Sequence, residues 1–486
     1  MKLNKFILAG LLAAASLTGA SAQTIHIIGS TAYRAAVNDA IRSILAPGFT
    51  WATTASSTTN SALGGASTAL WNGTIKTGLT GAGNPIEIKT AFSGSIAGAA
   101  DLAEGTKAKF IPDGSYSTSG TPNQSATELD TPDMAWTDTD ATTDQNVCKN
   151  AVSKAAYNAL ASAGLVEAGG AGAEGQGIVY FELIEEALTS GSTSPFTGLS
   201  TDNLATLAQD GYISLAQLSG TDTAGNETTD IVLTGRSEDS GSRANAFACA
   251  FEGGNVGATT QLQYQPFYSG AFQTYSDNGS MESNAHTATV EEGGTGSTLT
   301  SLSLWPGKWG LNSDTTIFWT KAGLGGGFNS GGNLALAMSA TNPITTVSFT
   351  DANGNAATAV YVVTYLAGAD AATCVAGSPV TLNTTNAQAT RLSYNGVQYS
   401  QAAVLNGSYN IWGYEHAYYL PSATGVAQNA MDDIAKEVET VTAEDDAFLD
   451  QNVTTDAAVG IFLPANVGGT EEVNRSAPGV PPTEDY

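Results

Sequence analysis

One short segment, Arg236 to Ser242, combines the residue types that a site for a small anion needs. Arg236 has a planar guanidinium, which suits the bidentate hydrogen bonding of phosphate or carboxylate. Ser240 and Ser242 add hydroxyl donors, and Gly241 lets the backbone approach a bound group closely. Glu238 is placed to hold the guanidinium in one orientation. The segment therefore predicts an oxyanion site, with an ordinary Ser/Gly loop as the alternative.

The elements around this segment would hold its polar residues in place. Ile231–Leu233 is a short apolar run of the kind that forms a buried strand. From Ala244 onward, Phe247 and Phe251 share one face at a spacing of four residues, which predicts a helix. Residues 240–242 then occupy the N-cap region, where unpaired N–H groups and the helix dipole favour an anion.

Two earlier stretches repeat the order strand, hydroxyl-bearing turn, helix. The strand Thr24–Ile28 is followed by Ser30 and Thr31, and apolar residues then recur at helical spacing up to Ile44. The alternating run 85–92 is followed by Ser93-Gly94-Ser95 and a helical pattern over 96–104. Either turn can be a plain connection capped by a hydroxyl.

Together, these motifs resemble those of PstS-like phosphate-binding proteins, in the same chain order. Thr137-Asp138 resembles a Ser-Asp pair of that family. The resemblance weakens after Ser95, where residues 96–98 are poorer in Gly than the family's turn. It implies neutral donors and one cation around the anion, at Ser30, Thr31, Ser95, Arg236, Ser240, Gly241 and Ser242.

For Asp138, the resemblance implies a role other than that of a donor: its carboxylate accepts the proton of the ligand. A carboxylate accepts a proton from a monoprotonated oxyanion but repels a fully ionised one, so it selects phosphate over sulfate. Because acidic residues crowd the stretch 130–144, a solvated acidic loop is an alternative. A calcium loop is another, although the Gly and the terminal Glu of an EF-hand are missing.

The resemblance also implies the fold, an α/β type 2 periplasmic binding protein with two lobes and a cleft between them. It covers roughly residues 24–252 and, more loosely, 355–420. We expect a first part of lobe 1 over 23–177 and lobe 2 over 178–360, with a β-rich insertion at about 253–344. A second part of lobe 1 would span 361–467, and a disordered tail 468–486.

Composition restricts the partners and the location. The chain of 486 residues has 17 Lys and Arg against 45 Asp and Glu, a net charge of -28. This charge argues against binding nucleic acid or an anionic membrane surface, and any anion site must be local. Residues 1–22 read as a signal peptide: Lys2 and Lys5 precede a short apolar run, and Ala20-Ser21-Ala22 is a cleavage site. No Cys lies near that site, so we expect a periplasmic or secreted protein without a lipid anchor.

Catalytic and metal motifs are missing from the sequence. The three His residues lack metal-ligand spacing, and neither a G-x-S-x-G elbow nor a Walker motif occurs. We therefore expect a non-enzyme without cofactor or metal. Three Cys residues leave one disulfide plus one thiol open; they are Cys148, Cys249 and Cys374.

The expected function is that of a monomeric solute-binding protein for a small oxyanion, above all phosphate. The resemblance implies delivery to an ABC-type permease. Two alternatives remain open at this stage. The chain could be a surface or structural protein that keeps the lobed fold without its ligand. It could also bind carbohydrate, because aromatic residues such as Trp305, Trp309 and Trp319 cluster in the insertion.

Overall fold

The computed structural model describes most of the two expected lobes. The described residues are 22–59, 66–114, 116–145, 154–169, 178–187, 196–220, 229–236, 240–251, 355–375 and 389–444, with short segments between 263 and 350 and between 461 and 484. The predicted signal peptide up to Ser21, Cys148, Glu238, and most of the predicted insertion and tail lie outside them.

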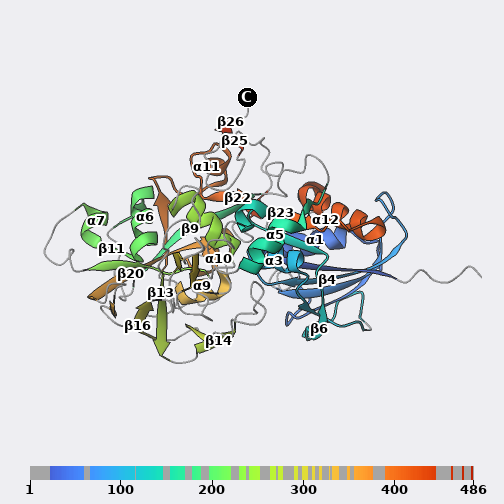
Figure 1. Cartoon of the computed structure of the whole chain (residues 1–486), viewed down its shortest axis with the longest axis horizontal. Coiled ribbons are helices and arrows are strands. Elements are labelled where there is room, and N and C mark those ends of the chain that lie inside the picture. The colour runs from blue at the N-terminus through green and yellow to red at the C-terminus, as the bar shows by residue number, and fades with distance from the viewer. Residues whose placement is uncertain are drawn as a thin grey trace, which may run out of the picture.

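Two mixed sheets, each with its own helices, form two lobes that lie side by side along the long axis of the molecule (Figure 1). The first sheet has the order β2-β3-β4-β1-β7-β23-β8. Its strands are β1 Gln23–Gly29, β2 Thr50–Thr53, β3 Thr68–Thr74, β4 Pro85–Phe92, β7 Met134–Thr137, β8 Val166–Glu167 and β23 His416–Tyr419. Its helices are α1 Arg34–Ile44, α3 Ser95–Glu104, α5 Lys154–Ala163 and α12 Gly425–Glu444.

The second sheet has the order β10-β21-β9-β20-β12-β11, and β19, β22 and β24 pair with its members. The strands are β9 Ile178–Ala187, β10 Gly198–Leu199, β11 Tyr212–Ser214, β12 Asp230–Leu233, β19 Val347–Thr350, β20 Ala356–Ala367, β21 Thr390–Tyr394, β22 Trp412–Tyr414 and β24 Ile461–Phe462. The helices are α6 Thr201–Asp210, α7 Leu215–Ser219, α8 Gly241–Ala246 with a π-helical turn Phe247–Phe251, α9 Gly331–Met338, α10 Gly368–Cys374 and α11 Gln401–Leu405. The predicted α/β, two-lobed fold is thus confirmed.

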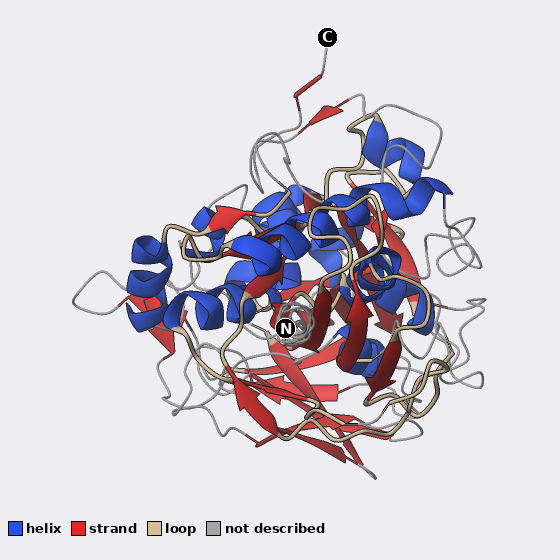
Figure 2. Cartoon of the chain, turned by 90° about the vertical axis from the view of Figure 1, so that its right-hand side faces the viewer, coloured by secondary structure: helices blue, strands red, loops and turns tan. Residues whose placement is uncertain are grey.

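Side-chain alternation along β1 explains why helices cover both faces of the first sheet. Ile25 and Ile27 pack into the core shared with α1 and α12, whereas Ile28 packs with Leu102 of α3 on the opposite face. Because both faces are buried, the strand reads as an almost continuous apolar run. Figure 2 shows the strands as a layer with helices beside them.

The smaller strand pairs lie outside the two main sheets. They are β5 Ala108–Phe110 with β6 Glu128–Asp130, β13 Tyr264–Ser269 with β16 Thr298–Leu304, β14 Phe272–Ser276 with β15 Thr289–Gly293, β17 Trp309–Leu311 with β18 Ile317–Trp319, and β25 Val473–Asn474 with β26 Thr483–Glu484. Those between 264 and 319 fall in the segment where a β-rich insertion was predicted.

The domain boundary at residue 361 differs from the prediction. β20 pairs with β9 and β12, and β21 pairs with β9, so both strands belong to the second sheet. The chain returns to the first lobe only after β22, which pairs with β9, because β23 pairs with β7. The apolar run of β20 signals a strand in the sequence, but its partner is set by long-range pairing.

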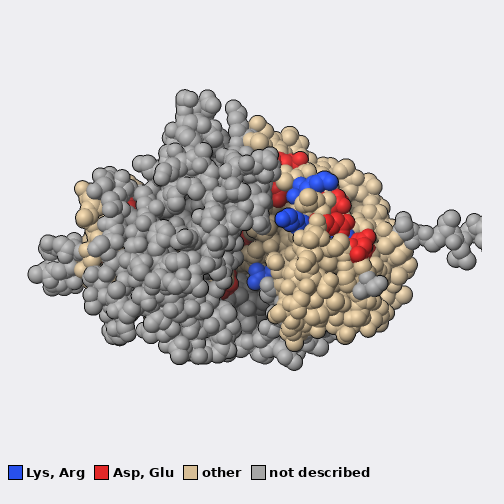
Figure 3. Space-filling view, turned by 90° about the horizontal axis from the view of Figure 1, so that it is seen from below, with Lys and Arg blue, Asp and Glu red and all other residues tan. Residues whose placement is uncertain are grey.

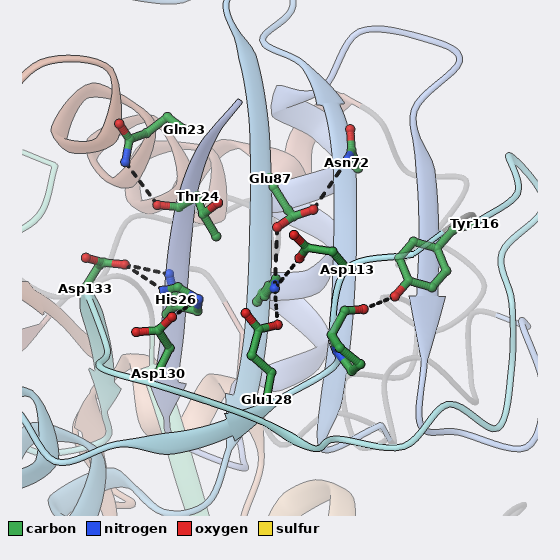
Figure 4. Close-up of polar contacts among 12 residues, drawn as sticks. Gln23, Thr24, His26, Asn72, Glu87, Asp113, Tyr116, Glu128, Asp130 and Asp133 are labelled. Atoms are coloured by element: carbon green, nitrogen blue, oxygen red, sulfur yellow. Dashed lines mark hydrogen bonds and ion pairs between the residues drawn. The ribbon is translucent and has the colours of Figure 1, made fainter. Parts of the chain in front are cut away.

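A buried lysine joins β4 to the hairpin that precedes β7 (Figure 4). Lys89 is 1% exposed and forms ion pairs with Asp113 at 2.6 Å, Glu87 at 3.5 Å and Glu128. Burial alone would lower the pKa of Lys89, but hydrogen bonds to Asp113 and Glu128 outweigh it and the pKa is raised. On the neighbouring strand, His26 contacts Asp133 at 3.2 Å. Residues 105–131 therefore fold onto the sheet instead of forming a detached loop.

On the described surface of the first lobe, basic and acidic atoms lie next to one another in a band (Figure 3). Seen from below, basic and acidic atoms also lie in a recess where this lobe meets the rest of the molecule. Within the part of the chain that is described, no helix combines the length and apolarity needed to cross a membrane.

Candidate anion-binding site

Three strand ends of the first lobe meet at one edge of its sheet. β1 runs parallel to both β4 and β7, with Gly29 opposite Phe92 and Trp136. The turns after β1 and β4 are joined, since the amides of Ser93 and Gly94 donate to the carbonyl of Gly29 at 3.2 and 3.0 Å. The carboxyl ends of parallel strands are where open α/β sheets place ligands. The segments that carry Ser30, Ser95 and Asp138 begin here.

Asp138 lies at a place where the two lobes touch. Its carboxylate accepts hydrogen bonds from Ser95 of the first lobe and, at 3.1 Å, from Ser242 of the second. Asn245 of α8 donates to its backbone carbonyl. A Cβ on Gly241 would clash with the Asp138 carboxylate and lie 2.7 Å from Cβ of Ser95, so only glycine permits this approach. Residues separated by more than a hundred positions thus form one buried polar cluster.

The acidic stretch around Asp138 is solvated only in part, since the side chains of Asp130 and Asp133 are 45% and 44% exposed. Asp138 and Asp144 are both fully buried. Asp144 accepts hydrogen bonds from Thr137, at 3.0 Å, and from Thr139. Among the residues that the structure describes, no group of three or more His, Cys, Asp or Glu side chains is placed to hold a metal ion.

Helix α8 begins earlier, and is shorter, than its apolar pattern predicts. Ser240 is its N-cap, and the hydroxyl accepts from the amide of Arg243 at 3.4 Å. The α-helical part ends at Ala246 and continues as the π-helical turn. Because so short a helix aligns few peptide dipoles, the positive potential at this site must come chiefly from side chains.

Arg236 is the cation of this cluster. It is 4% exposed, and its Nε donates to the carbonyl of Phe328 at 3.1 Å. Its backbone amide donates to the hydroxyl of Tyr365 at 3.1 Å, and its carbonyl accepts from Arg243 at 3.2 Å. These contacts fix the chain immediately after β12.

The charge of Arg236 acts on Asp138. Burial raises the pKa of Asp138 to about 6, while its own backbone, Arg236 and Ser242 each act to lower it. The guanidinium and the carboxylate therefore share one environment, and Asp138 can both accept and release a proton near neutral pH.

No protein-family model matches the sequence, and no curated protein matches it. Solved structures do match. The chain is similar to a proposed phosphate ABC transporter substrate-binding protein from Clostridium perfringens with bound phosphate, at 11% identity and a TM-score of 0.38, covering 91% of this chain and 99% of the other.

Two further structures are similar to this chain. One is PstS from Borrelia burgdorferi, at 11% identity and a TM-score of 0.32, covering 88% of this chain and 96% of the other. The other is a proposed phosphate-binding protein from Planctomyces limnophilus, at 9% identity and a TM-score of 0.30, covering 88% and 91%.

The sequence-predicted residues differ in how closely the structure joins them. Ser95, Gly241 and Ser242 contact Asp138 directly or nearly so. Ser30 is fully buried nearby, and its Oγ has no hydrogen-bond partner among the described residues. The remaining predicted residues have different surroundings: Thr31 is half-buried, Ser240 caps α8, and Arg236 acts on Asp138 through its charge.

Two charged residues beside the site were missed by sequence reasoning. Arg34 donates to the carbonyl of Thr31 at 2.9 Å, and its pKa is lowered by burial and by Arg236 but raised by Asp370. Asp370 follows β20, the parallel neighbour of β12, so its approach to Arg236 depends on strand register. Arg34 had one available signal: it is a rare basic residue three positions after a candidate ligand.

Proposed function

We propose that this chain is an exported solute-binding protein that captures a small oxyanion, phosphate in the first place, between its two lobes. The supporting observation is the contact of Ser95 and Asp138 in one lobe with Gly241 and Ser242 in the other. Arg236 places a positive charge on the same cluster. A ligand held by both sides would favour closure of the lobes.

The chemistry of the cluster suits a monoprotonated phosphate. The hydroxyls of Ser95 and Ser242 can donate to a phosphate oxygen as they do to a carboxylate. Arg236 supplies the charge that neutral donors lack. An ionised Asp138 accepts the proton of the ligand and disfavours sulfate, which carries no proton at neutral pH. The proposal also assigns the role of neutral hydrogen-bond donors around the anion to four further residues, Ser30, Thr31, Ser240 and Gly241.

Export and transfer complete the proposed role. Residues 1–22 have the pattern of a signal peptide that directs the chain across a membrane. In this proposal the bound anion then passes to an ABC-type permease, as the name of the similar structure from Clostridium perfringens suggests for that protein.

Thermal unfolding with added anions tests the proposal. A ligand that binds only the folded state adds about 2.7 kcal/mol to the free energy of unfolding at 100 times its Kd. We expect phosphate and arsenate to raise Tm and sulfate to raise it much less at pH 7.5. A chain that responds to none of the three anions lacks the proposed function, and a response to glycans instead would favour the carbohydrate alternative.

A further inference from the structure

Glu415 lies where the chain crosses from the second lobe back to the first. It separates β22, which pairs with β9, from β23, which pairs with β7. The side chain is fully buried, and neither carboxyl oxygen has a hydrogen-bond partner among the described residues. A buried carboxylate without donors costs several kcal/mol if it is ionised. The position therefore calls for a neutral, protonated acid.

The groups around Glu415 connect it to the anion site. Asp138 and Asp144 are close enough to affect its charge, and Ser30 makes a polar contact with it. The Oγ of Ser30 lacks a hydrogen bond of ordinary geometry, as does Oδ1 of Asn245, and both side chains are fully buried. These unpaired polar atoms lie around the crossover, since a Cβ on Gly413 would be 2.6 Å from Oδ1 of Asn245.

Of the three acids at this place, Asp138 is the one that ionises most readily, because burial raises the pKa of both Asp144 and Glu415 well above the usual values. Ser95 and Ser242 donate to Asp138, and two threonine hydroxyls donate to Asp144, whereas Glu415 has only the polar contact with Ser30 and accepts no hydrogen bond of ordinary geometry from a described residue. Burial raises the pKa of Glu415 well above its usual value, Asp138 and Asp144 raise it further, and Ser30 opposes them.

On its own strand, Glu415 is followed by a histidine that is already paired. His416 Nδ1 lies 2.7 Å from Glu167 of β8. Arg236 also bears on the cluster, because its charge acts on Asp138. Burial is therefore the main cause that keeps Glu415 neutral, and the neighbouring acids add to its effect.

We propose that Glu415 is a specificity-determining residue of the anion site, a neutral acid behind Asp138 that leaves Asp138 free to ionise and accept the ligand's proton. If Glu415 were ionised, its charge would push a proton onto Asp138 and would repel the anion. This inference rests on the proposed function, because it assigns a residue to the same site.

Calorimetric titration with inorganic phosphate from pH 7 to 9.5 tests the inference. We expect the affinity of the wild-type chain to fall on the alkaline side, by up to about tenfold per pH unit once Glu415 ionises. Glu415→Gln cannot ionise and should bind phosphate with a flat profile. The control Glu104→Gln, at an exposed position of α3, should follow the wild type.

Melting curves of the same proteins in the absence of phosphate provide a second measurement. A carboxyl whose pKa is higher in the folded than in the unfolded state makes the protein less stable as pH rises, because the unfolded chain gives up its proton first. Glu415→Gln lacks this effect, so its Tm should exceed that of the wild type by a margin that grows with pH. An alkaline decline in affinity that persists in Glu415→Gln, or a variant whose Tm falls below the wild type as pH rises, would overturn the inference. If the wild type takes up no phosphate at any pH, the proposed function itself fails, and the role of Glu415 with it.

Discussion

Among the residues of the site, Asp138 matters most for anion selectivity, because the protonation state of its carboxyl group decides which anion the site binds. Burial raises its pKa to about 6 against the opposing effect of Arg236. Above pH 6 the ionised group accepts a proton from phosphate and repels sulfate. Below pH 6 the protonated group can itself donate to sulfate.

We therefore expect the preference for phosphate over sulfate to decrease as pH falls from 8 to 5. Asp138→Asn, which is neutral at every pH, should show a weaker preference without this pH dependence. The ratio of the two affinities, measured by calorimetry, checks the expectation, with the exposed Asp202→Asn as a matched control. A preference that stays constant in the wild type would show that Asp138 does not select the anion.

Sequence reasoning reached those site residues that lie in turns directly after recognisable strands. Ser95 and Asp138 are of this kind, and each follows a short apolar run. Asp370 and Glu415 were out of reach, because their proximity to the site depends on strand register and on where the chain changes lobes. Residue types alone carry no information on either.

Among the elements, α8 shows how one glycine allows the lobes to touch. A Cβ at Gly241 would clash with Asp138, although alanine is the better helix former by about 1 kcal/mol. We expect Gly241→Ala to keep or increase helix content while weakening phosphate binding at least tenfold.

Far-UV circular dichroism and calorimetry on the same sample measure both effects of Gly241→Ala. Ser240→Ala is a useful comparison, since it removes the N-cap hydroxyl without adding bulk and should cost about 1 kcal/mol of stability. Undiminished binding by Gly241→Ala would mean that the close contact of α8 with Asp138 is not needed.

The strand β4 gives a second prediction, for stability. Lys89→Met removes the one cation that Glu87, Asp113 and Glu128 share. We expect a loss of about 3 kcal/mol at pH 7, below the largest values for buried pairs because Asp113 is exposed. The loss should shrink in part towards pH 4, because Glu87, whose pKa is raised by burial, takes up a proton, whereas Asp113, whose pKa is lowered by Lys89, stays ionised.

Urea unfolding at pH 7 and pH 4 measures this change, and Lys109→Met, at an exposed site of β5, is the control. If Lys89→Met is as stable as the control at pH 7, the buried ion pairs do not hold the hairpin to the sheet.

At the scale of helices and strands, the sequence predicted those elements whose residue pattern is local. The runs that became β1 and β12 are apolar, the run that became β4 alternates, and all three end at Gly, Ser or Thr turns. Residues 361–369 were assigned to the first lobe, yet β20 lies between β9 and β12. The periodicity of a strand identifies the strand but not its neighbours.

At the scale of the whole molecule, the net charge of -28 opposes the capture of an anion. The local charge of Arg236 must act against this field. Salt screens the long-range repulsion more than it screens contacts within a buried site. We expect the association rate constant for phosphate to rise several-fold between 0.01 and 0.15 M salt, with a smaller change in the dissociation rate constant.

Stopped-flow measurements of tryptophan fluorescence can follow this association, because Trp136 lies in β7 just before Asp138. A rate constant that falls as salt is added would mean that the field at the entrance is positive, contrary to the net charge.

The most direct test of the account is the heat of phosphate uptake by the wild-type chain and by Arg236→Ala. Removing one member of a buried charge pair commonly costs 2–5 kcal/mol of binding, so we expect affinity to fall by roughly 30-fold or more. The circular dichroism spectrum should stay unchanged, and the exposed Lys107→Ala should bind as the wild type does. Equal uptake by the wild type and Arg236→Ala would contradict the central claim that this guanidinium and Asp138 form one phosphate site.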